Sequence, residues 1–255
     1  MEKYLNFENI GIPICVIKDT NKKQLKDKII YLDEKEENIH GFDHFQLEGD
    51  GKLQLTINPK SERTIWYVVG SSGSGKSFFV GKLCAEYLKY FPKNPIYMIS
   101  TVSDDSSLDG IKMNHIVIGD NLLEETVTAK DFQDSLVIID DADQISNTKH
   151  RKAVQAISNS ILEIGRHYNV SCAFTNHVAC AGHDTKRILN ESHSITLFPR
   201  TAGNKTLKYL LDSYLGLDKH EIQKVKKLKS RAVTILKTFP KVVVSEKNVF
   251  ILGNE

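Results

Sequence analysis

The spacing of apolar and polar residues changes character at about residue 60. Before that point, short apolar runs are separated by clusters of Asn, Gly and Asp, a pattern typical of β-strands joined by turns. After it, apolar strands alternate with segments in which apolar residues recur every three or four positions, as along one face of a helix. The change predicts a β-rich elaboration over residues 1–60 and an α/β domain over residues 61–255.

The apolar runs predict the individual elements. In the N-terminal part, strands are expected at Ile12–Ile17, Lys28–Leu32 and Lys52–Ile57. In the α/β part, strands are expected at Ile65–Val69, Ile96–Ser100, His115–Ile118, Leu136–Asp140, Ser171–Thr175, Ile195–Phe198, Val233–Lys237 and Val242–Leu252. Helices are expected at Ser77–Phe91, His150–His167, Lys205–Leu215 and, from the capping-box spacing of its first residues, Asp218–Lys229.

The strand predicted at Leu136–Asp140 is apolar up to its last residue. Such a strand is covered on both faces, as in a parallel sheet flanked by helices. The helix predicted at His150–His167 places Val154, Ile157 and Ile161 on one face, which suits it to cover such a sheet. The predicted fold class is therefore α/β, with a mainly parallel central sheet flanked by helices.

The composition indicates a chain that stays in a reducing compartment. The four cysteines are far apart, form no C-x-x-C pair, and three of them lie in apolar runs, which favours buried free thiols over disulfides or a zinc site. No run approaches the roughly 18 apolar residues of a membrane helix, and the N-terminus lacks a basic segment that leads into an apolar one. We therefore expect no membrane partner and no export.

The net charge of +2 conceals an uneven distribution. Residues 27–50 carry eight acidic and two basic residues, whereas residues 202–255 carry eleven basic and five acidic residues. This asymmetry is compatible with a basic surface that faces a partner, and equally with two solvated faces. The basic segment Lys219–Arg231 accordingly has two interpretations, a contact with DNA or another acidic partner, and a solvated helix face.

Residues 70–77 read G-S-S-G-S-G-K-S and stand between a predicted strand and a predicted helix, the context that separates a true P-loop from a chance match. Its glycines let backbone N–H groups converge on a phosphate, and the helix dipole adds positive potential there. Lys76 would bridge the β- and γ-phosphates, and the Ser77 hydroxyl would bind Mg²⁺. The predicted nucleotide-binding residues are Gly70, Ser71, Ser72, Gly73, Ser74, Gly75, Lys76, Ser77 and Phe78.

Two adjacent carboxylates, Asp140 and Asp141, follow the apolar run of the strand predicted at Leu136–Asp140. Asp140 would hold Mg²⁺ as a Walker B acid does, and Asp141 would polarise an attacking water, with Asp143 as the next candidate for that role. A small-molecule kinase usually needs no such second acid, so the pair favours water as the acceptor. The same residues also fit an acidic loop after a strand.

Three further side chains are candidates for the nucleotide site. Asn176 follows the strand predicted at Ser171–Thr175 and is placed to sense the γ-phosphate or orient water, with Thr175 as a weaker candidate and an ordinary turn as the alternative. Arg166 would pair with a helix dipole or reach the ATP of a neighbouring subunit as an arginine finger. Arg200 is a second candidate for such an arginine at a subunit interface.

Lys186 and Arg187 are candidates for contacts with DNA. They are basic residues in a polar segment that follows the strand predicted at Ser171–Thr175. Lysine and arginine contacts to phosphates hold DNA without reading its sequence and weaken with salt. An ordinary solvated loop is the alternative.

Together these motifs resemble the FtsK–HerA group of DNA translocases, whose Walker A sequence is followed by an acidic Walker B, a Gly-Arg pair and a strand that ends in Thr-Gln. The same order and similar spacing occur here in Gly70–Ser77, Asp140–Asp141, Gly165–Arg166 and Thr175–Asn176. The segments 166–171 and 175–177 look most like the genome-packaging ATPases of large nucleocytoplasmic DNA viruses and virophages. Asp141 and Asn176 stand where many members carry Glu and Gln, which are one methylene longer.

The resemblance implies a RecA-like P-loop NTPase fold of the ASCE type that binds ATP and Mg²⁺. It also implies a ring of five or six identical subunits that threads double-stranded DNA into a capsid, with a capsid portal protein as a further partner. The implied location is the viral factory in the host cytoplasm and the virion. The residues expected to carry catalysis are Lys76, Asp141, Asn176 and Arg166, with Ser77 and Asp140 as metal ligands.

Other P-loop classes remain as alternatives. A nucleoside or nucleotide kinase shares the P-loop, but no clearly spaced Arg-rich lid is present. A switch GTPase would carry an N-K-x-D guanine signature, which the sequence lacks. A DNA helicase on the same fold shares every site named above, so only the reaction on DNA separates it from a translocase.

Overall fold

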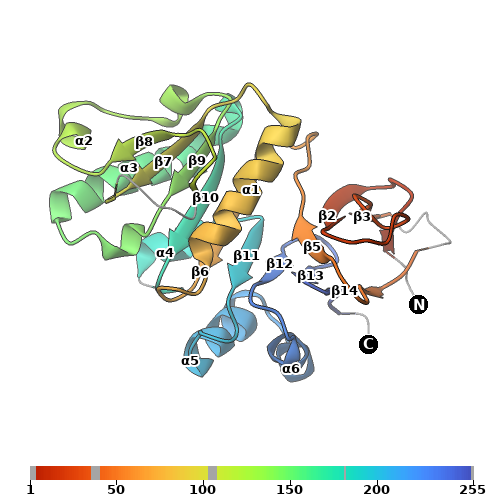
Figure 1. The fold of residues 1–255 in the computed structure, drawn as a ribbon. Helices are drawn as coiled ribbons and strands as arrows, with labels where there is room; N and C mark the ends of the chain where they lie inside the picture. Colours follow the sequence, from red (N-terminus) through yellow and green to blue (C-terminus); the bar gives the residue numbers. More distant parts are fainter. Residues whose placement is uncertain (1–3, 36–40, 103–107, 181, 254–255) are drawn as a thin grey trace. The chain divides into compact units, whose positions relative to one another are not determined.

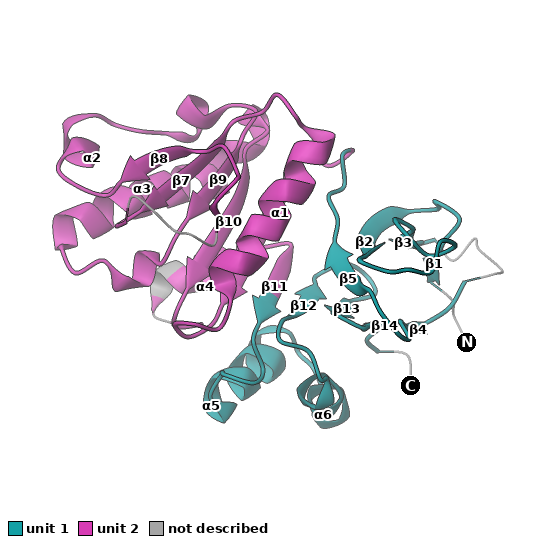
Figure 2. Cartoon of the chain, viewed as in Figure 1, with its two compact units in different colours: residues 1–59, 196–255 teal, residues 60–195 magenta. Residues whose placement is uncertain are grey.

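The computed structural model describes residues 4–35, 41–102, 108–180 and 182–253 (Figure 1). Part of the acidic segment 27–50, residues 36–40, and Ala181 in the segment before Lys186 lie outside the described residues. The chain forms two compact units (Figure 2). One unit is Lys60–Ile195, and the other combines Met1–Pro59 with Thr196–Glu255.

The unit Lys60–Ile195 contains a parallel sheet. Its strands lie in the order β6 (Ile65–Val69), β10 (Ser171–Asn176), β9 (Leu136–Ile139), β7 (Ile96–Ser100) and β8 (Asn114–Val117). Each neighbouring pair runs parallel, so that Phe174 stands opposite Tyr67 on one side and Ile139 on the other. Every residue of β6, β9 and β10 is buried, and the predicted parallel sheet is confirmed.

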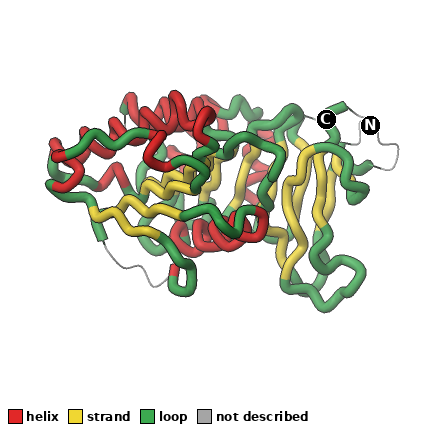
Figure 3. Tube along the Cα trace, turned by 90° about the horizontal axis from the view of Figure 1, so that it is seen from above, coloured by secondary structure: helices red, strands yellow, loops and turns green. Residues whose placement is uncertain are grey.

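Helices cover both faces of this sheet (Figure 3). The longer ones are α1 (Lys76–Tyr90), α3 (Thr148–Ile164) and α4 (His183–Glu191). Shorter helical segments are α2 (Asn121–Glu124), η2 (Ala129–Phe132), η3 (Ala142–Gln144) and η4 (Gly165–Tyr168). Asn147 caps α3 by accepting a hydrogen bond from the N–H of Lys149 at 2.9 Å. In the described part of the chain, no helix combines the length and the apolar character that a membrane span requires.

The other unit is built mainly from antiparallel strands. One sheet has the order β1 (Leu5–Asn6), β3 (Ile29–Leu32), β2 (Ile12–Lys18) and β5 (Lys52–Leu55). Four further strands pair in the order β12 (Val233–Leu236), β13 (Val242–Ser245), β14 (Asn248–Ile251) and β4 (His44–Gln46). Its helices are α5 (Asn204–Lys208), the π-helical segment Tyr209–Tyr214, and α6 (Lys219–Lys227), and β11 (Ser194–Leu197) spans the boundary between the units.

Three predicted elements differ from the structure. The strand expected at Val242–Leu252 is instead a hairpin of β13 and β14, which turns where the N–H of Asn248 donates to the Ser245 hydroxyl at 3.0 Å. The helix expected at Lys205–Leu215 is divided between α5 and the π-helical segment. The polar segment expected to be a loop around Lys186 contains α4.

The two compact units also differ from the predicted division into residues 1–60 and 61–255. Residues 196–255 group with Met1–Pro59 because segments from both parts are bonded to each other. Strand β14 pairs with β4, and the ammonium of Lys247 donates to the carbonyl of Gly51 at 2.6 Å. The basic segment Lys219–Arg231 therefore belongs to the β-rich unit.

All four cysteines are free thiols, and Cys15, Cys84 and Cys172 are buried, as the sequence predicted. Burial raises the pKa of Cys84 to about 12 and raises the pKa of Cys172 well above its ordinary value. Cys180 is only partly buried. Because the thiolate is the reactive form, the three buried thiols should be inert in the folded chain.

We expect a thiol-reactive reagent to modify Cys180 before the other three cysteines, because Cys180 alone is partly exposed. The substitution Cys180→Ser should remove the fast phase, and the remaining thiols should react only on unfolding. Mass spectrometry of the modified peptides measures the order of labelling. Rapid labelling of Cys84 or Cys172 in the folded Cys180→Ser variant would contradict the packing of α1 and β10.

Candidate active site

The carboxyl ends of β6, β9 and β10 bring three segments of the chain together. Residues 70–77 follow β6, residues 140–143 follow β9, and residues 177–180 follow β10. β10 lies between the other two strands, so its end is next to both segments. The N–H of Gly70 donates to the carbonyl of Asn176 at 3.1 Å, which attaches the predicted P-loop to the end of β10.

The predicted P-loop has a backbone that glycine favours. Gly73 and Gly75 have φ angles of 72° and 109°, in the region that glycine adopts without strain. Gly75 immediately precedes α1, so the free N–H groups of the first turn of α1 belong to this loop. Ser71 and Ser72 are exposed. An anion bound at the loop would meet both these N–H groups and the positive end of the helix dipole.

Lys76 is the first residue of α1, and only 7% of its side chain is exposed. Its ammonium donates to the carbonyl of Gly70 at 3.0 Å. The same Nζ lies 3.4 Å from Oδ1 of Asp141. A buried ammonium needs hydrogen-bonded or charged partners, and Lys76 finds both at the carboxyl ends of β6 and β9.

Asp141 is the centre of the polar contacts at this edge of the sheet. Its φ and ψ angles of 45° and 42° are left-handed, a region that Asp tolerates better than most residues. Oδ1 lies 3.4 Å from Nζ of Lys76 and 3.2 Å from the hydroxyl oxygen of Thr175. Oδ2 lies 2.7 Å from Nε2 of His177. The carboxylate therefore contacts one residue of β10, one residue that follows β10, and one residue that follows β6.

Thr175 joins Asp140, the predicted metal ligand, to Asp141, the predicted catalytic carboxylate. It lies within β10 and is completely buried. Its hydroxyl lies 2.5 Å from Oδ1 of Asp140 as a donor, and it accepts a hydrogen bond from the N–H of Asp141 at 3.0 Å. One hydroxyl thus orients the Asp140 side chain and the Asp141 backbone together.

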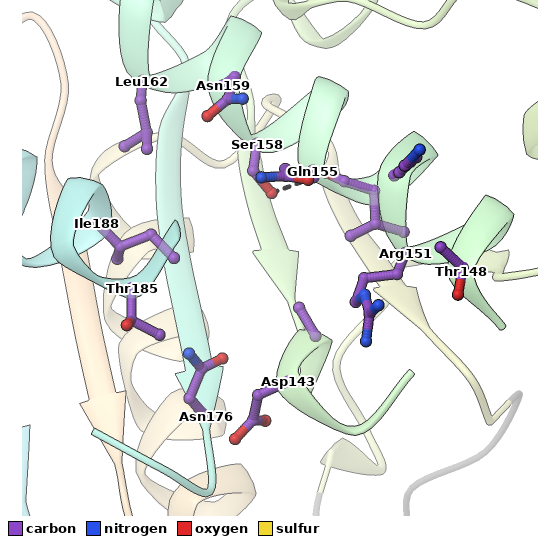
Figure 4. Close-up of a pocket in the computed structure, with 13 residues that line it drawn as sticks. Asp143, Thr148, Arg151, Gln155, Ser158, Asn159, Leu162, Asn176, Thr185 and Ile188 are labelled. Atoms are coloured by element: carbon purple, nitrogen blue, oxygen red, sulfur yellow. Dashed lines mark hydrogen bonds between the residues drawn. The ribbon is translucent and has the colours of Figure 1, made fainter. Parts of the chain in front are cut away.

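The predicted sensor Asn176 ends β10 and is 3% exposed. Its amide donates to the Tyr67 hydroxyl at 3.1 Å, and Tyr67 donates to the carbonyl of Ala179 at 3.0 Å. Figure 4 shows Asn176 near Asp143 at one end of a cavity of about 410 Å³ that α3 and α4 also line. The side chain of Asn176 thus lines this cavity and is hydrogen-bonded to Tyr67 of β6.

Asp143 anchors the segment that follows β10. Its carboxylate accepts hydrogen bonds from the N–H of His177 at 3.0 Å and from the N–H of Val178 at 2.8 Å. Two backbone amides therefore occupy the carboxylate that the sequence offered as an alternative to Asp141. This geometry gives Asp143 a part in holding His177 in place.

Arg166 lies at the opposite edge of the sheet from the P-loop. It belongs to η4, which precedes the amino end of β10, and its Nε lies 3.1 Å from a carboxylate oxygen of Glu62, which precedes β6. The Arg166 side chain is 64% exposed. The structure therefore brings Lys76, Asp140, Asp141 and Asn176 together, and does not bring Arg166 of the same chain to them.

The glycine before Arg166 has a separate structural reason. A Cβ at Gly165 would stand 3.1 Å from Nη1 of Arg63. The Arg63 guanidinium donates to the carbonyls of Ile161 and Leu162, which lie in the last turn of α3, at 2.5 and 2.9 Å. Gly165 thus leaves room for an arginine that satisfies the end of a helix.

The remaining predicted residues are spread over the surface. Lys186 is exposed on α4, and Arg187 on the same helix forms an ion pair with Glu163 of α3. Phe78 is 55% exposed on α1, with the ammonium of Lys82 at 4.7 Å from its ring centroid. Arg200 is exposed in the other unit.

The residues at this edge fit a nucleoside triphosphate with Mg²⁺. The P-loop offers backbone N–H groups and a buried ammonium to phosphates, and the Ser77 hydroxyl and the Asp140 carboxylate are oxygen ligands of the kind that Mg²⁺ prefers. Within the described residues, no group of three or more His, Cys, Asp or Glu side chains is arranged to hold a metal ion. Magnesium bound here would take further ligands from phosphate and water.

Two contributions were underestimated from the sequence. Thr175 was only a weaker candidate, although its hydroxyl contacts both carboxylates. His177 was not among the predicted site residues, although it contacts Asp141. The signal that could have identified both is their position at the end of a strand whose neighbours in the sheet carry the P-loop and the acidic pair.

One family model and one virophage protein match this chain. Residues 66–162 match the family model described as RNA helicase. The chain is 37% identical to the uncharacterized protein V3 of the Sputnik virophage over 194 residues, which are 75% of this chain and 78% of that protein.

Two solved structures resemble the fold. One is the genome packaging NTPase B204 of Sulfolobus turreted icosahedral virus 2 in complex with ATP-gammaS, with a TM-score of 0.51 and 18% identity over 74% of this chain and 99% of that one. The other is the cytoplasmic domain of the type VII secretion ATPase EccC of Thermomonospora curvata, with a TM-score of 0.50 and 10% identity over 84% of this chain and 29% of that one.

The fold and the site define a P-loop NTPase with a mixed α/β architecture and a large, mostly parallel sheet. The P-loop NTPase fold that the motifs predicted is confirmed, and this chain shares it with the packaging NTPase B204. The chain belongs to the family of protein V3 of the Sputnik virophage.

We expect the substitution Thr175→Val to lower the free energy of unfolding by about 1–2 kcal/mol, because it removes a hydroxyl that bonds to a carboxylate and to a backbone N–H. Thr175→Ser keeps the hydroxyl and is the matched control. Urea unfolding of the three proteins measures the difference. Equal stability of the valine variant and the native protein would contradict the bridging role of the hydroxyl.

Proposed function

We propose that this chain is an ATPase that moves double-stranded DNA into a viral capsid as a ring of identical subunits. The observation that supports the proposal most is the contact between Lys76 and Asp141, whose Nζ and Oδ1 atoms are 3.4 Å apart. It joins a lysine suited to phosphates with a carboxylate suited to orienting water. The motifs shared with packaging ATPases, and the fold shared with the packaging NTPase B204, support the role in packaging.

Each residue of the site has a proposed part in hydrolysis. Lys76 and the N–H groups of the P-loop bind the β- and γ-phosphates and neutralise their charge. Asp141 orients the attacking water, and Asn176 senses the γ-phosphate. Ser77 and Asp140 hold Mg²⁺, which when bound supplies positive charge to the phosphate oxygens.

Arg166 completes the site from the next subunit of the ring. Its exposed side chain is distant from the P-loop edge of its own sheet, which suits a residue that acts on a neighbour. An arginine supplied in this way stabilises the charge of the transition state and couples hydrolysis to assembly. Arg200, exposed in the other unit, is the second candidate for this role.

The proposed partners follow from the same role. Lys186, on the exposed surface of α4, would contact DNA phosphates, and Arg187 would join it by exchanging its ion pair with Glu163 for a phosphate. A capsid portal protein would receive the DNA. The protein would work where capsids are filled, in the viral factory of the host cytoplasm, and in the virion.

We expect the purified protein to hydrolyse ATP slowly and to be stimulated by double-stranded DNA, because each site needs a neighbour on the same duplex. Lys76→Ala should abolish binding of ATP. Asp141→Asn should bind ATP but hydrolyse it at least about 100-fold more slowly, because the base that orients water is lost. Release of free phosphate measures turnover, and equilibrium binding of a fluorescent ATP analogue measures affinity.

The same assay separates the alternatives. A wild-type rate that is independent of protein concentration and of DNA would contradict the motor. Transfer of the γ-phosphate to a nucleoside, instead of release of free phosphate, would identify a kinase. Full turnover by Asp141→Asn would assign the base to another residue, and competition between ATP and GTP tests the choice of nucleotide.

The trans role of Arg166 predicts complementation between two inactive variants. Arg166→Ala keeps its P-loop, and Lys76→Ala keeps its arginine, so a mixture of the two should recover part of the DNA-stimulated ATPase activity. A mixture of Arg166→Ala with the double variant Lys76→Ala, Arg166→Ala is the control and should stay inactive. No recovery in the first mixture would contradict an arginine finger at Arg166 and direct the same experiment to Arg200.

A nucleic-acid helicase is the second candidate function. The match of residues 66–162 to a family model described as RNA helicase supports it. The two functions share the ATP site. They differ in whether the two strands of the nucleic acid are separated. A strand-displacement assay beside a duplex-translocation assay separates them, since a packaging motor moves along a duplex without unwinding it.

A further inference from the structure

The contact between His177 and Asp141 fixes which ring nitrogen of His177 carries a proton. Nε2 of His177 lies 2.7 Å from Oδ2 of Asp141. An ionised carboxylate only accepts hydrogen bonds, so Nε2 must carry the proton in this contact. Both side chains are about one quarter to one third exposed, at 26% and 30%, so the pair is shielded more than an ordinary surface pair.

The imidazole is itself held in place. Asp143 accepts hydrogen bonds from the N–H groups of His177 and Val178 at 3.0 and 2.8 Å, which fixes the backbone directly after β10. Asp143 lies two residues after Asp141, in η3. The segments after β9 and β10 are therefore joined through the backbone N–H groups of His177 and Val178 and through the His177 side chain.

The carboxylate of Asp141 has little freedom while these contacts last. Oδ2 faces His177, and Oδ1 faces Thr175 and Lys76 at 3.2 and 3.4 Å. Its backbone is left-handed, with φ of 45°, and its N–H donates to the Thr175 hydroxyl at 3.0 Å. Each carboxylate oxygen has two acceptor positions, so a water molecule can still bind beside His177.

We propose that His177 is a positioning residue that sets the direction of the Asp141 carboxylate for hydrolysis. The inference rests on the proposed ATPase function, in which Asp141 orients the attacking water. Loss of the imidazole would leave Asp141 bound to Lys76 and Thr175 on one oxygen only, free to turn about its Cβ–Cγ bond. A displacement of about 1 Å at such a group lowers a rate by about 100-fold, without a matching effect on substrate binding.

The test uses three substitutions that differ in reach. His177→Gln places an amide N–H at about the position of Nε2, whereas His177→Asn places it at about the position of Nδ1, too far from Asp141. His177→Ala removes the donor altogether. We expect the alanine and asparagine variants to lower kcat of DNA-stimulated ATP hydrolysis by about 10- to 100-fold. The glutamine variant should recover most of the rate, and KM for ATP should stay within about twofold in all three.

His150→Ala is the matched control. Nε2 of His150 lies 2.8 Å from Oδ1 of Asp120, so this substitution breaks a second histidine–carboxylate pair of the same unit, outside the candidate site. It should leave kcat unchanged. Binding of a non-hydrolysable ATP analogue, measured for every variant, shows whether the P-loop is intact.

The outcomes distinguish this inference from the proposed function. If the native protein hydrolyses ATP and His177→Ala or His177→Asn does so at the native rate, the positioning role is overturned and the ATPase function stands. Equal losses in the glutamine and asparagine variants would also overturn it, since the reach of the donor would not matter. If the native protein lacks DNA-stimulated hydrolysis, the proposed function fails, and the role of His177 with it.

Discussion

The position of β10 between β6 and β9 is the constraint on which the site depends. Because the three strands are parallel, the P-loop, the acidic pair and the polar end of β10 reach the same edge of the sheet. Thr175, inside β10, then contacts Asp140 and Asp141 with one hydroxyl, and the carbonyl of Asn176 receives the N–H of Gly70. The ends of two strands that do not pair with each other are joined by the strand between them.

Much of the parallel sheet could be predicted from the sequence, because strands buried on both faces are apolar throughout. The predicted bounds of Ile65–Val69 and Ile96–Ser100 agree with β6 and β7. The helix around Lys186 could not be predicted, since it is short and strongly polar and shows no apolar stripe long enough to count. The hairpin at Val242–Ile251 was hidden because its turn carries Ser, Glu, Lys and Asn without a glycine or proline.

The candidate site was predictable in part for a similar reason. A P-loop and a strand that ends in two carboxylates are local patterns, whose chemistry depends on residues near in sequence. The contacts of Thr175 and His177 with Asp141 join residues more than thirty positions apart, and no local pattern reveals which side chain points at which oxygen. The grouping of residues 196–255 with Met1–Pro59 has the same origin, since it depends on pairing between β14 and β4.

The two residues of the Gly165–Arg166 pair have different surroundings. Gly165 makes room for Arg63, which satisfies two carbonyls in the last turn of α3. This helix end is followed by η4 and then by β10. Arg166 is left exposed beside Glu62, at the edge opposite the P-loop. Gly165 therefore stabilises its own chain. Arg166 could contact another molecule only if its weak ion pair with Glu62 opens.

The proposed function rests on a site for the phosphates of ATP that Lys76 and Asp141 form. A crystal structure with Mg²⁺ and a non-hydrolysable ATP analogue tests it most directly. We expect the β- and γ-phosphates within hydrogen-bond distance of the P-loop N–H groups, with Nζ of Lys76 turned from the carbonyl of Gly70 to the phosphate oxygens. An analogue bound elsewhere, with Lys76 still bonded to Gly70 and Asp141, would contradict it.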